Sequence, residues 1–319
     1  MVGKKYLGFD IGLSGIKLAY FSKGICGVKC ELLDFIPFKD VDFYDLEIAI
    51  REYRIFDAIM KVMDLVNYKG RKIVIPLPGD TTRVFLIRDA GEREDDDYKG
   101  IVQEFASRIF DGIIPIGLEV TWHVLSRKNG KVDIIGVLYN SSVVEGFREF
   151  FSAYTDRFEI EPAPVSLYNL YSLLVPTFRN DNKHKLLLHL GVRDVVICIV
   201  SRDGDLLCGR TRSELNVLPD EGLTLEKVAP YLEEVTRAFK DFMYKVCFEE
   251  CDDLSDFDIY ITGGPAISSV LVEAFEVVLR LKVKPFNFLT NFPFKVYKGV
   301  PIDIAPRFAL AVGAVISRI

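Results

Sequence analysis

The spacing of apolar and polar residues divides the first part of the chain into three strands, a helix and a fourth strand. Residues 5 to 11, 16 to 22 and 28 to 36 predict strands joined by short turns. Apolar residues at helical spacing then occupy residues 42 to 66, and an apolar stretch at 71 to 78 predicts a buried strand. This pattern is typical of a meander followed by a helix that returns to the same sheet.

A separate module is expected over residues 83 to 160. Its pattern predicts in turn a strand, a helix, two strands and a helix, at 83–87, 97–110, 117–125, 131–139 and 141–154. The acidic run at 92 to 97 indicates a solvated helix start, since carboxylates are favoured there. Most phenylalanines of the module are expected in its core, and a few could line a groove, among them Phe105, Phe147, Phe150 and Phe151.

The opening pattern recurs in the second half of the chain, after a helix expected at 165–175. "YLGFDIGLSGIKLAYFSKG" (6–24) and "LLLHLGVRDVVICIVSRDG" (186–204) share an apolar strand, a polar residue, a glycine turn and a second apolar strand. A helix, a buried strand and two further helices follow, at 225–246, 258–264, 265–281 and 306–319. The chain is therefore expected to form two lobes of related plan, with an insertion in the first.

Composition narrows the class of protein. The chain has 319 residues, of which 50% are hydrophobic, and a formal net charge of −6. This excludes a disordered chain and argues against nucleic acid as a partner. No apolar run reaches the roughly 20 residues that cross a bilayer, and no secretory signal is apparent. We expect a cytosolic protein that reaches a membrane only through a partner.

The six cysteines are expected to be buried thiols. Two pairs are separated by three residues and lack a neighbouring histidine, which disfavours zinc: Cys26 with Cys30, and Cys247 with Cys251. Cys198 and Cys208 lie symmetrically about a turn signal, so they are expected to face each other across a hairpin.

The first glycine turn carries a candidate phosphate site. Gly12 and Gly15 allow backbone N–H groups to approach an anion, and the Ser14 hydroxyl can add a hydrogen bond. Lys17 has the reach to contact phosphates, and Asp10 can hold Mg²⁺ through coordinated waters. A hairpin with these residues chosen for geometry alone is the plainer alternative, but the recurrence of the motif favours binding.

A third glycine site follows the buried strand near residue 260. Gly263 and Gly264 precede an expected helix that opens with Pro265, where a ribose or phosphate could lie against bare backbone at the helix N-terminus. The three glycine sites indicate a nucleotide in the cleft between the lobes.

These motifs resemble those of the actin-like ATPases. "GFDIGLSGIK" is similar to their first phosphate motif, "HLGVRD" to the second and "DIYITGGPA" to the adenosine motif. Within that superfamily the whole chain resembles the PilM family of type IV pilus assembly, with the FtsA family of cell-division proteins as a relative.

The resemblance implies an α/β, two-lobed actin-like ATPase fold, with duplicated ribonuclease H-like domains and an inserted 1C subdomain. Its boundaries would be 1–82 and 161–182 for the first lobe (1A), 83–160 for subdomain 1C and 183–319 for the second lobe (2A and 2B). It also implies ATP and Mg²⁺ as ligands. The binding residues would be Asp10, Gly12, Ser14, Gly15, Lys17, His189, Gly191, Gly263, Gly264 and Pro265, with Glu234 and Arg237 as weaker candidates.

The implied function is a cytoplasmic scaffold at the inner membrane of a type IV pilus machine. Its partner would be the N-terminal cytoplasmic tail of PilN, in a groove associated with subdomain 1C, and self-association is also conceivable in this superfamily. The alternatives are an FtsA-like filament protein and a small-molecule kinase. The first usually carries a C-terminal amphipathic membrane helix, which is not seen before Ile319, and the second needs a carboxylate base.

Two positions of the second phosphate motif depart from the superfamily pattern. His189 stands where the second phosphate motif normally begins with aspartate, and Asp194 stands where threonine or serine is usual. A neutral histidine cannot replace a carboxylate in orienting hydrated Mg²⁺ or an attacking water. We therefore expect at most a weak ATPase. His189 either contacts phosphate or merely caps a strand, and Arg193 either faces the phosphates or points into solvent.

Overall fold

A computed structural model describes residues 4–12, 14–25, 27–38, 54–66, 68–77, 82–93, 98–174, 183–192, 194–201, 206–212, 223–246, 256–280, 282–291, 295–296 and 303–319. The expected helix at 42–66 is present as α2 (Arg54–Leu65), and its expected first part lies outside the described residues. Residues 94–97 of the acidic run and three of the six cysteines, Cys26, Cys247 and Cys251, also lie outside them.

The first sheet has the strand order β14-β3-β2-β1-β4-β8. The expected meander is β1 (Lys4–Gly12), β2 (Gly15–Gly24) and β3 (Gly27–Pro37), all antiparallel. On the other side of β1, β4 (Lys72–Leu77) and β8 (Phe158–Pro162) add in parallel. The short strand β14 (Lys295–Val296) pairs with β3 although it comes late in the chain.

The second sheet repeats this plan, with the strand order β11-β10-β9-β12-β13. Its meander is β9 (His184–Leu190), β10 (Asp194–Val200) and β11 (Leu206–Arg212), and its parallel strands are β12 (Phe257–Gly263) and β13 (Val283–Pro285). Cys198 pairs with Cys208 across β10 and β11, as expected, with the sulfur atoms 3.7 Å apart. The duplication expected from the sequence is therefore present in the strand order.

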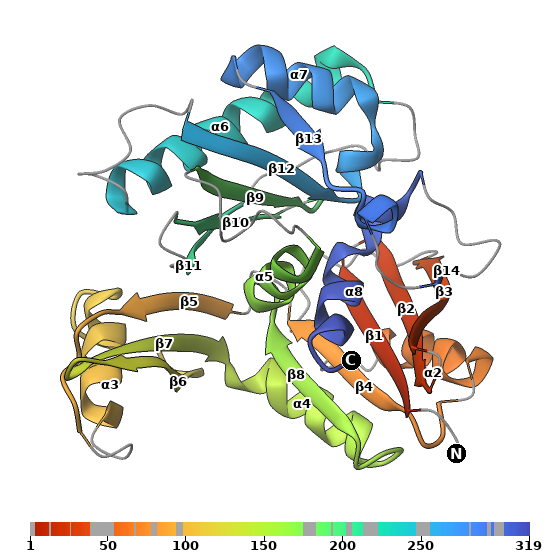
Figure 1. Ribbon diagram of the computed structural model, residues 1–319, viewed down its shortest axis with the longest axis horizontal. Coiled ribbons are helices and arrows are strands. Elements are labelled where there is room, and N and C mark those ends of the chain that lie inside the picture. The colour runs from red at the N-terminus through yellow and green to blue at the C-terminus, as the bar shows by residue number, and fades with distance from the viewer. Residues whose placement is uncertain are drawn as a thin grey trace.

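Helices form layers on both sheets (Figure 1). The helices α2 and α4 (Ser141–Ser152) cover the outer face of the first sheet, and α6 (Leu225–Val246) and α7 (Ser269–Leu279) cover the outer face of the second. Between the sheets lie α5 (Ala163–Leu174) and α8 (Ala309–Ile316). Alternating layers of this kind bury both faces of each sheet, which explains why its central strands are almost wholly apolar.

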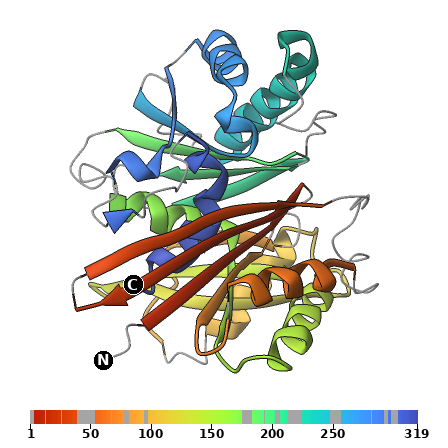
Figure 2. The ribbon, with the colours of Figure 1, turned by 90° about the vertical axis from the view of Figure 1, so that its right-hand side faces the viewer.

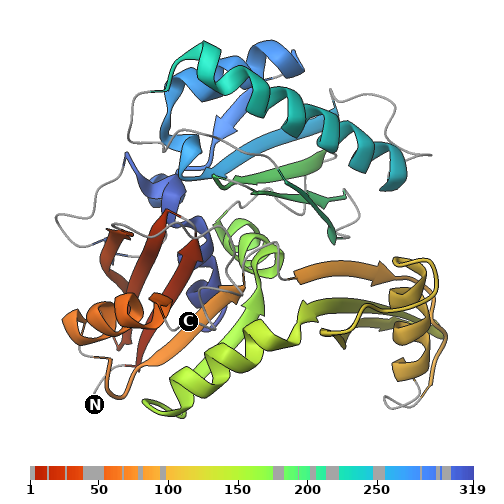
Figure 3. The ribbon, with the colours of Figure 1, turned by 180° about the vertical axis from the view of Figure 1, so that it is seen from behind.

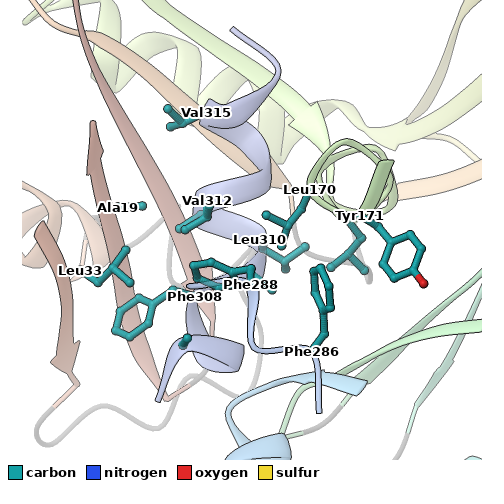
Figure 4. Close-up of a cluster of buried hydrophobic side chains, with 14 of the residues drawn as sticks. Ala19, Leu33, Leu170, Tyr171, Phe286, Phe288, Phe308, Leu310, Val312 and Val315 are labelled. Carbon is teal, nitrogen blue, oxygen red and sulfur yellow. The ribbon is translucent and has the colours of Figure 1, made fainter. Parts of the chain in front are cut away.

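The core between the sheets joins the two lobes (Figure 4). Leu310 and Val312 of α8 pack with Leu170 and Tyr171 of α5, and residues of both sheets belong to the same cluster. Contact between these helices is unusually close, because a Cβ atom on Gly313 would lie 2.0 Å from the carbonyl oxygen of Ser166. The two helices thus form the packed connection between the lobes.

A third sheet, in the order β5-β7-β6, projects to one side of the first lobe (Figure 3). It consists of β5 (Thr82–Ile87), β6 (Leu118–Lys128) and β7 (Lys131–Asn140), and packs against α3 (Tyr98–Arg108). The helix after it, α4, instead places Phe147 and Phe151 in the core of the first sheet. The subdomain boundaries remain predictions, and this packing favours an insertion that ends near residue 140.

The prediction of one continuous helix over residues 265–281 is wrong. The stretch 265–281 begins as a 3₁₀ turn, η4 (Pro265–Ile267), and α7 starts only after Ser268, whose backbone is extended. The terminal helix likewise begins with a 3₁₀ turn, η6 (Ala305–Phe308), and a further turn, η5 (Phe288–Asn291), precedes β14. Helical periodicity continues through such breaks, so the apolar spacing alone does not reveal them.

Candidate functional site

The first glycine turn places Asp10 and Lys17 side by side at the cleft end of the first sheet. They are paired across β1 and β2, and Lys17 Nζ lies 3.4 Å from Asp10 Oδ2. Both side chains are buried, at 9% and 6% exposure, and Asp10 Oδ2 has no hydrogen-bond partner. A buried carboxylate oxygen without a hydrogen bond is costly, so it is a natural position for a cation or a bound water.

Glycine is required at the two positions of this turn for different structural reasons. A Cβ atom on Gly12 would lie 2.6 Å from Lys17 Nζ, so the lysine folds back over the turn. Gly15 has φ +147°, and a Cβ atom there would lie 2.3 Å from the carbonyl oxygen of Ile36 in β3. Gly12 and Ser14 line the cavity between the lobes, whereas Gly15 is required by packing against the neighbouring strand.

The second glycine turn faces the first from the other sheet. His189 is buried in β9, and its Nδ1 lies 3.1 Å from Thr262 Oγ1 of β12. Burial lowers the pKa of His189 to about 4, with Lys17 acting in the same direction and Asp10 opposing it. The ring is therefore neutral at physiological pH and can offer only one acceptor nitrogen.

The turn after His189 is closed by a backbone hydrogen bond and held by a tyrosine of α6. The N–H of Gly191 donates to the carbonyl oxygen of Asp194 at 2.7 Å, and a Cβ atom on Gly191 would lie 2.5 Å from Asp194 Oδ1. The Tyr231 hydroxyl of α6 donates to the carbonyl oxygen of Gly191 at 3.2 Å. Burial, together with the Asp194 carboxylate, raises the pKa of Tyr231 well above its usual value, so the hydroxyl stays a donor. Arg193 lies outside the described residues.

The third glycine site differs from the expectation. Gly263 has φ +98°, and a Cβ atom there would lie 2.0 Å from the carbonyl oxygen of Leu190, so this glycine serves the contact between β12 and β9. Gly264 and Pro265 line the cavity, but they begin a three-residue 3₁₀ turn. The expected α-helical N-terminus is thus absent at this point, which weakens the case for an anion held by a helix dipole.

These motifs meet in one small cavity between the lobes. Its volume is about 50 Å³, and it is lined from both sheets, η4 and α8. The expected residues that line it are Asp10, Gly12, Ser14, Lys17, His189, Gly191, Gly264 and Pro265. A single water occupies about 30 Å³ in the liquid, so the lobes must part before a nucleotide could enter.

Some expected residues do not line this cavity. Glu234 is partly exposed on α6 and Arg237 is exposed there, and neither contributes to the lining. The sequence did not predict the hydrogen bonds of Tyr231 with Gly191 and of Thr262 with His189. Each joins residues that are far apart in the sequence, and neither residue carries a local signal of its partner. Asp194 was noted only as an unusual residue, and the structure places it in the lining.

A second hollow lies on the outer face of the first lobe, between α2 and α4. Its volume is about 710 Å³. Phe56 of α2 and Phe150 of α4 stack on each other there, with ring centroids 4.2 Å apart. The lining carries three carboxylates, from Asp57, Glu145 and Glu149, and no basic residue. We call this the α2–α4 groove.

Two features are absent from the part of the chain that the structure describes. None of the helices there is both long and apolar enough to cross a membrane. No group of three or more histidine, cysteine, aspartate or glutamate side chains gathers there as a metal centre.

Comparison of the coordinates with solved structures identifies the fold. A chain of a PilM–PilN type IV pilus biogenesis complex matches with a TM-score of 0.74 and 17% sequence identity, over 98% of this chain and 98% of that chain. A Bacteroides thetaiotaomicron protein described as having an actin-like ATPase fold and unknown function matches with a TM-score of 0.53 and 13% identity, over 97% and 96% of the two chains. The chain has the actin-like ATPase fold.

The fold recurs with different sequences. The ethanolamine utilization protein EutJ from Carboxydothermus hydrogenoformans matches with a TM-score of 0.50 and 12% identity, over 98% of this chain and 89% of that chain. No protein-family model and no curated protein matches this chain. Since folds host many functions, what the chain binds must be argued from the side chains of its sites.

Proposed function

We propose that this protein is a cytoplasmic, ATP-binding scaffold of the inner-membrane assembly platform of a type IV pilus. In this proposal it binds the N-terminal cytoplasmic tail of a PilN-like membrane protein. The observation that carries the proposal is the match to a chain of a PilM–PilN complex over 98% of both chains.

The cavity between the lobes supports ATP and Mg²⁺ as ligands. Lys17 presents an ammonium group beside the Gly12 backbone, which suits phosphate oxygens. Asp10 Oδ2 lacks a hydrogen bond and suits a water of hydrated Mg²⁺. When bound, the nucleotide would supply negatively charged phosphate groups, and residues of both glycine turns would hold them. Because a ligand shifts an equilibrium by its differential affinity, such a bridge would favour the joined arrangement of the lobes.

The same cavity supports weak or absent hydrolysis. His189 of the second turn interacts with the charges of Asp10 and Lys17, and burial keeps its ring neutral. Asp194 does line the cavity, but its Oδ1 is turned onto its own loop beside Gly191. A scaffold requires that nucleotide binds between the lobes but does not require that it is hydrolysed. Weak hydrolysis therefore agrees with the proposal.

The α2–α4 groove supports the binding of a short tail. Its aromatic floor suits apolar side chains and the flat face of an arginine, and its three carboxylates favour basic residues. Of the phenylalanines expected to be mostly core, Phe147 and Phe151 are buried, whereas Phe150 lines the groove. The tail of the partner is therefore proposed to lie there with basic and apolar residues facing the protein.

Nucleotide binding is tested by calorimetric titration with Mg²⁺-ATP. We expect binding to the wild-type chain and at least tenfold weaker binding to Lys17→Ala and Asp10→Ala, since each removes a charged group of the cavity. Lys227→Ala is the matched control, because this lysine is exposed on α6. Equal affinity in all variants would refute the placement of the phosphates.

Tail binding is tested separately, by fluorescence anisotropy with a labelled PilN-tail peptide. We expect Glu149→Lys to weaken it at least tenfold, and Glu233→Lys, an exposed change on α6, to leave it unaltered. No binding of the peptide with or without Mg²⁺-ATP would remove the scaffold proposal. The two experiments fail independently, so loss of nucleotide binding alone would leave tail binding standing.

A further inference from the structure

One end of the first sheet gathers basic side chains from elements that are far apart in the sequence. Lys4 starts β1 and pairs with Lys23 at the end of β2. Lys72 starts β4, where it pairs with Tyr6, and Arg157 directly precedes β8. The marked chain ends lie at this end of the strands (Figure 2). It is opposite to the cleft, since Lys4 and Asp10 are six residues apart along β1, about 20 Å.

The basic side chains surround a hollow of about 680 Å³. Its lining includes Lys4, Lys5, Lys72, Arg157 and Arg318, and its carboxylates are those of Asp156 and Glu159. We call this the basic end of the sheet. Its positive sign contrasts with the net charge of −6 of the whole chain.

The carboxylates leave part of this positive charge uncompensated. Glu159 binds both Lys72 and Arg318, the latter at 2.9 Å through Nε, and Arg318 also pairs with Glu161 at 2.8 Å. Lys4 and Arg157 are exposed, and neither has an ion pair in the described part of the chain. An uncompensated basic cluster around a hollow attracts anionic groups, and phosphate esters above all.

An exposed apolar residue lies in the hairpin turn next to the basic end of the sheet. Ile25 is 89% exposed in the turn between β2 and β3. It lies between Lys23 and Lys29 in sequence, and these two residues are the nearest basic side chains on the two strands of the hairpin. Gly24 adjoins it, so the tip projects without bulky neighbours on that side. Basic residues around an isolated apolar tip are typical of surfaces that lie on the polar layer of a membrane.

We propose that the basic end of the sheet docks on an anionic phospholipid bilayer, with the exposed Lys4 and Arg157 on the headgroups and Ile25 inserted among them. This goes beyond the proposed function, in which the membrane is reached through a partner, and it needs neither nucleotide nor tail. An acidic protein would satisfy the charges but would leave no role for an apolar side chain that projects from a hairpin tip.

Vesicle sedimentation tests the proposal with the full chain. We expect the protein to sediment with vesicles of phosphatidylglycerol and phosphatidylcholine at low salt, and not with phosphatidylcholine alone. Each basic residue near a membrane surface contributes roughly fivefold to partitioning, so Lys4→Glu with Arg157→Glu should lower it at least tenfold. Ile25→Asp should lower it as well while leaving the basic residues in place.

The controls separate a bilayer from other anions. Lys227→Glu with Lys240→Glu makes the same change of charge at exposed positions of α6, and should sediment like the wild type. If inorganic phosphate at millimolar concentration prevented sedimentation with the vesicles, the site would be one for a free anion, and the bilayer proposal would be overturned. Equal sedimentation of all variants, or none of the wild type with anionic vesicles, would also overturn it. Circular dichroism verifies that each variant is folded.

Discussion

A buried glutamate, Glu161, lies where the first sheet packs against the helices between the lobes. Glu161 is 5% exposed on β8, where it accepts a hydrogen bond from Ser166 of α5 and pairs with Arg318 at 2.8 Å. Burial raises its pKa to about 7, with Glu159 acting in the same direction and Arg318 and Ser166 opposing. The side chain thus links the sheet to α5 and to Arg318, which follows α8.

The pH dependence of stability should reveal Glu161. Because its folded pKa is raised above the ordinary value of 4.5, its contribution to stability is present below pH 4.5 and is lost as pH rises through about 7. Glu161→Gln keeps the shape without the titration. Relative to wild type, its free energy of unfolding should therefore rise between pH 5 and 8, by on the order of 2 kcal/mol. Urea unfolding at several pH values measures this, and a constant difference between the proteins would contradict it.

His189 is proposed to limit what the cavity can catalyse. Its ring is neutral and hydrogen-bonded to Thr262, and the carboxylate that the second turn does bring to the cavity, that of Asp194, has its Oδ1 beside Gly191 in its own turn. We expect His189→Asp to raise ATP hydrolysis at least about tenfold over wild type, since a carboxylate can orient a water where the ring cannot. His189→Asn, neutral and similar in size, should remain at the wild-type rate. Phosphate release measures both, and equal rates would show that this position does not limit hydrolysis.

At the scale of elements, glycine sets how closely α8 approaches its neighbours. A Cβ atom on Gly313 would lie 2.0 Å from the carbonyl oxygen of Ser166 in α5. On the other side of α8, a Cβ atom on Gly8 of β1 would lie 2.0 Å from the carbonyl oxygen of Ala311. Both contacts are to backbone, which cannot rotate away as a flexible side chain can.

The prediction at this scale compares two glycines in helices. Gly313→Ala should destabilise the protein by about 2 kcal/mol or more, because α8 and α5 must separate. Gly100→Ala in α3 has no atom within 4 Å of its new Cβ, and should stabilise by about 0.5 to 1 kcal/mol through helix propensity. Thermal unfolding of both variants measures the contrast, and similar shifts would mean that the helix contact relaxes easily.

At the scale of the whole molecule, the cavity joins turns from both lobes, so a ligand there should be felt by both. Amide hydrogen exchange with Mg²⁺-ATP should slow in the β1–β2 turn and in the turn after β9 together. Lys17→Ala should lose both effects at the same nucleotide concentration. Slowing confined to one lobe would contradict a ligand that bridges them.

Much of the fold could be read from the sequence because it depends on local periodicity. The repeated meander predicted two related sheets, and the pairing of Cys198 with Cys208 followed from one turn signal. The helix expected at 265–281 failed because an extended Ser268 does not disturb the apolar spacing. The sequence also did not predict that α4 packs on the first sheet, since its buried phenylalanines could equally have packed in the core of the third sheet.

By itself, the sequence determined the order of strands and helices, the duplication and the candidate residues of two glycine turns, all of which are encoded over short stretches. Only the tertiary structure decided which of those residues meet. It placed Asp10, Lys17, His189 and Asp194 around one cavity and left Glu234 outside it. It also gathered Lys4, Lys72, Arg157 and Arg318 at one end of a sheet. Such meetings depend on sheet register and helix packing between distant segments, for which a single sequence carries no local signal.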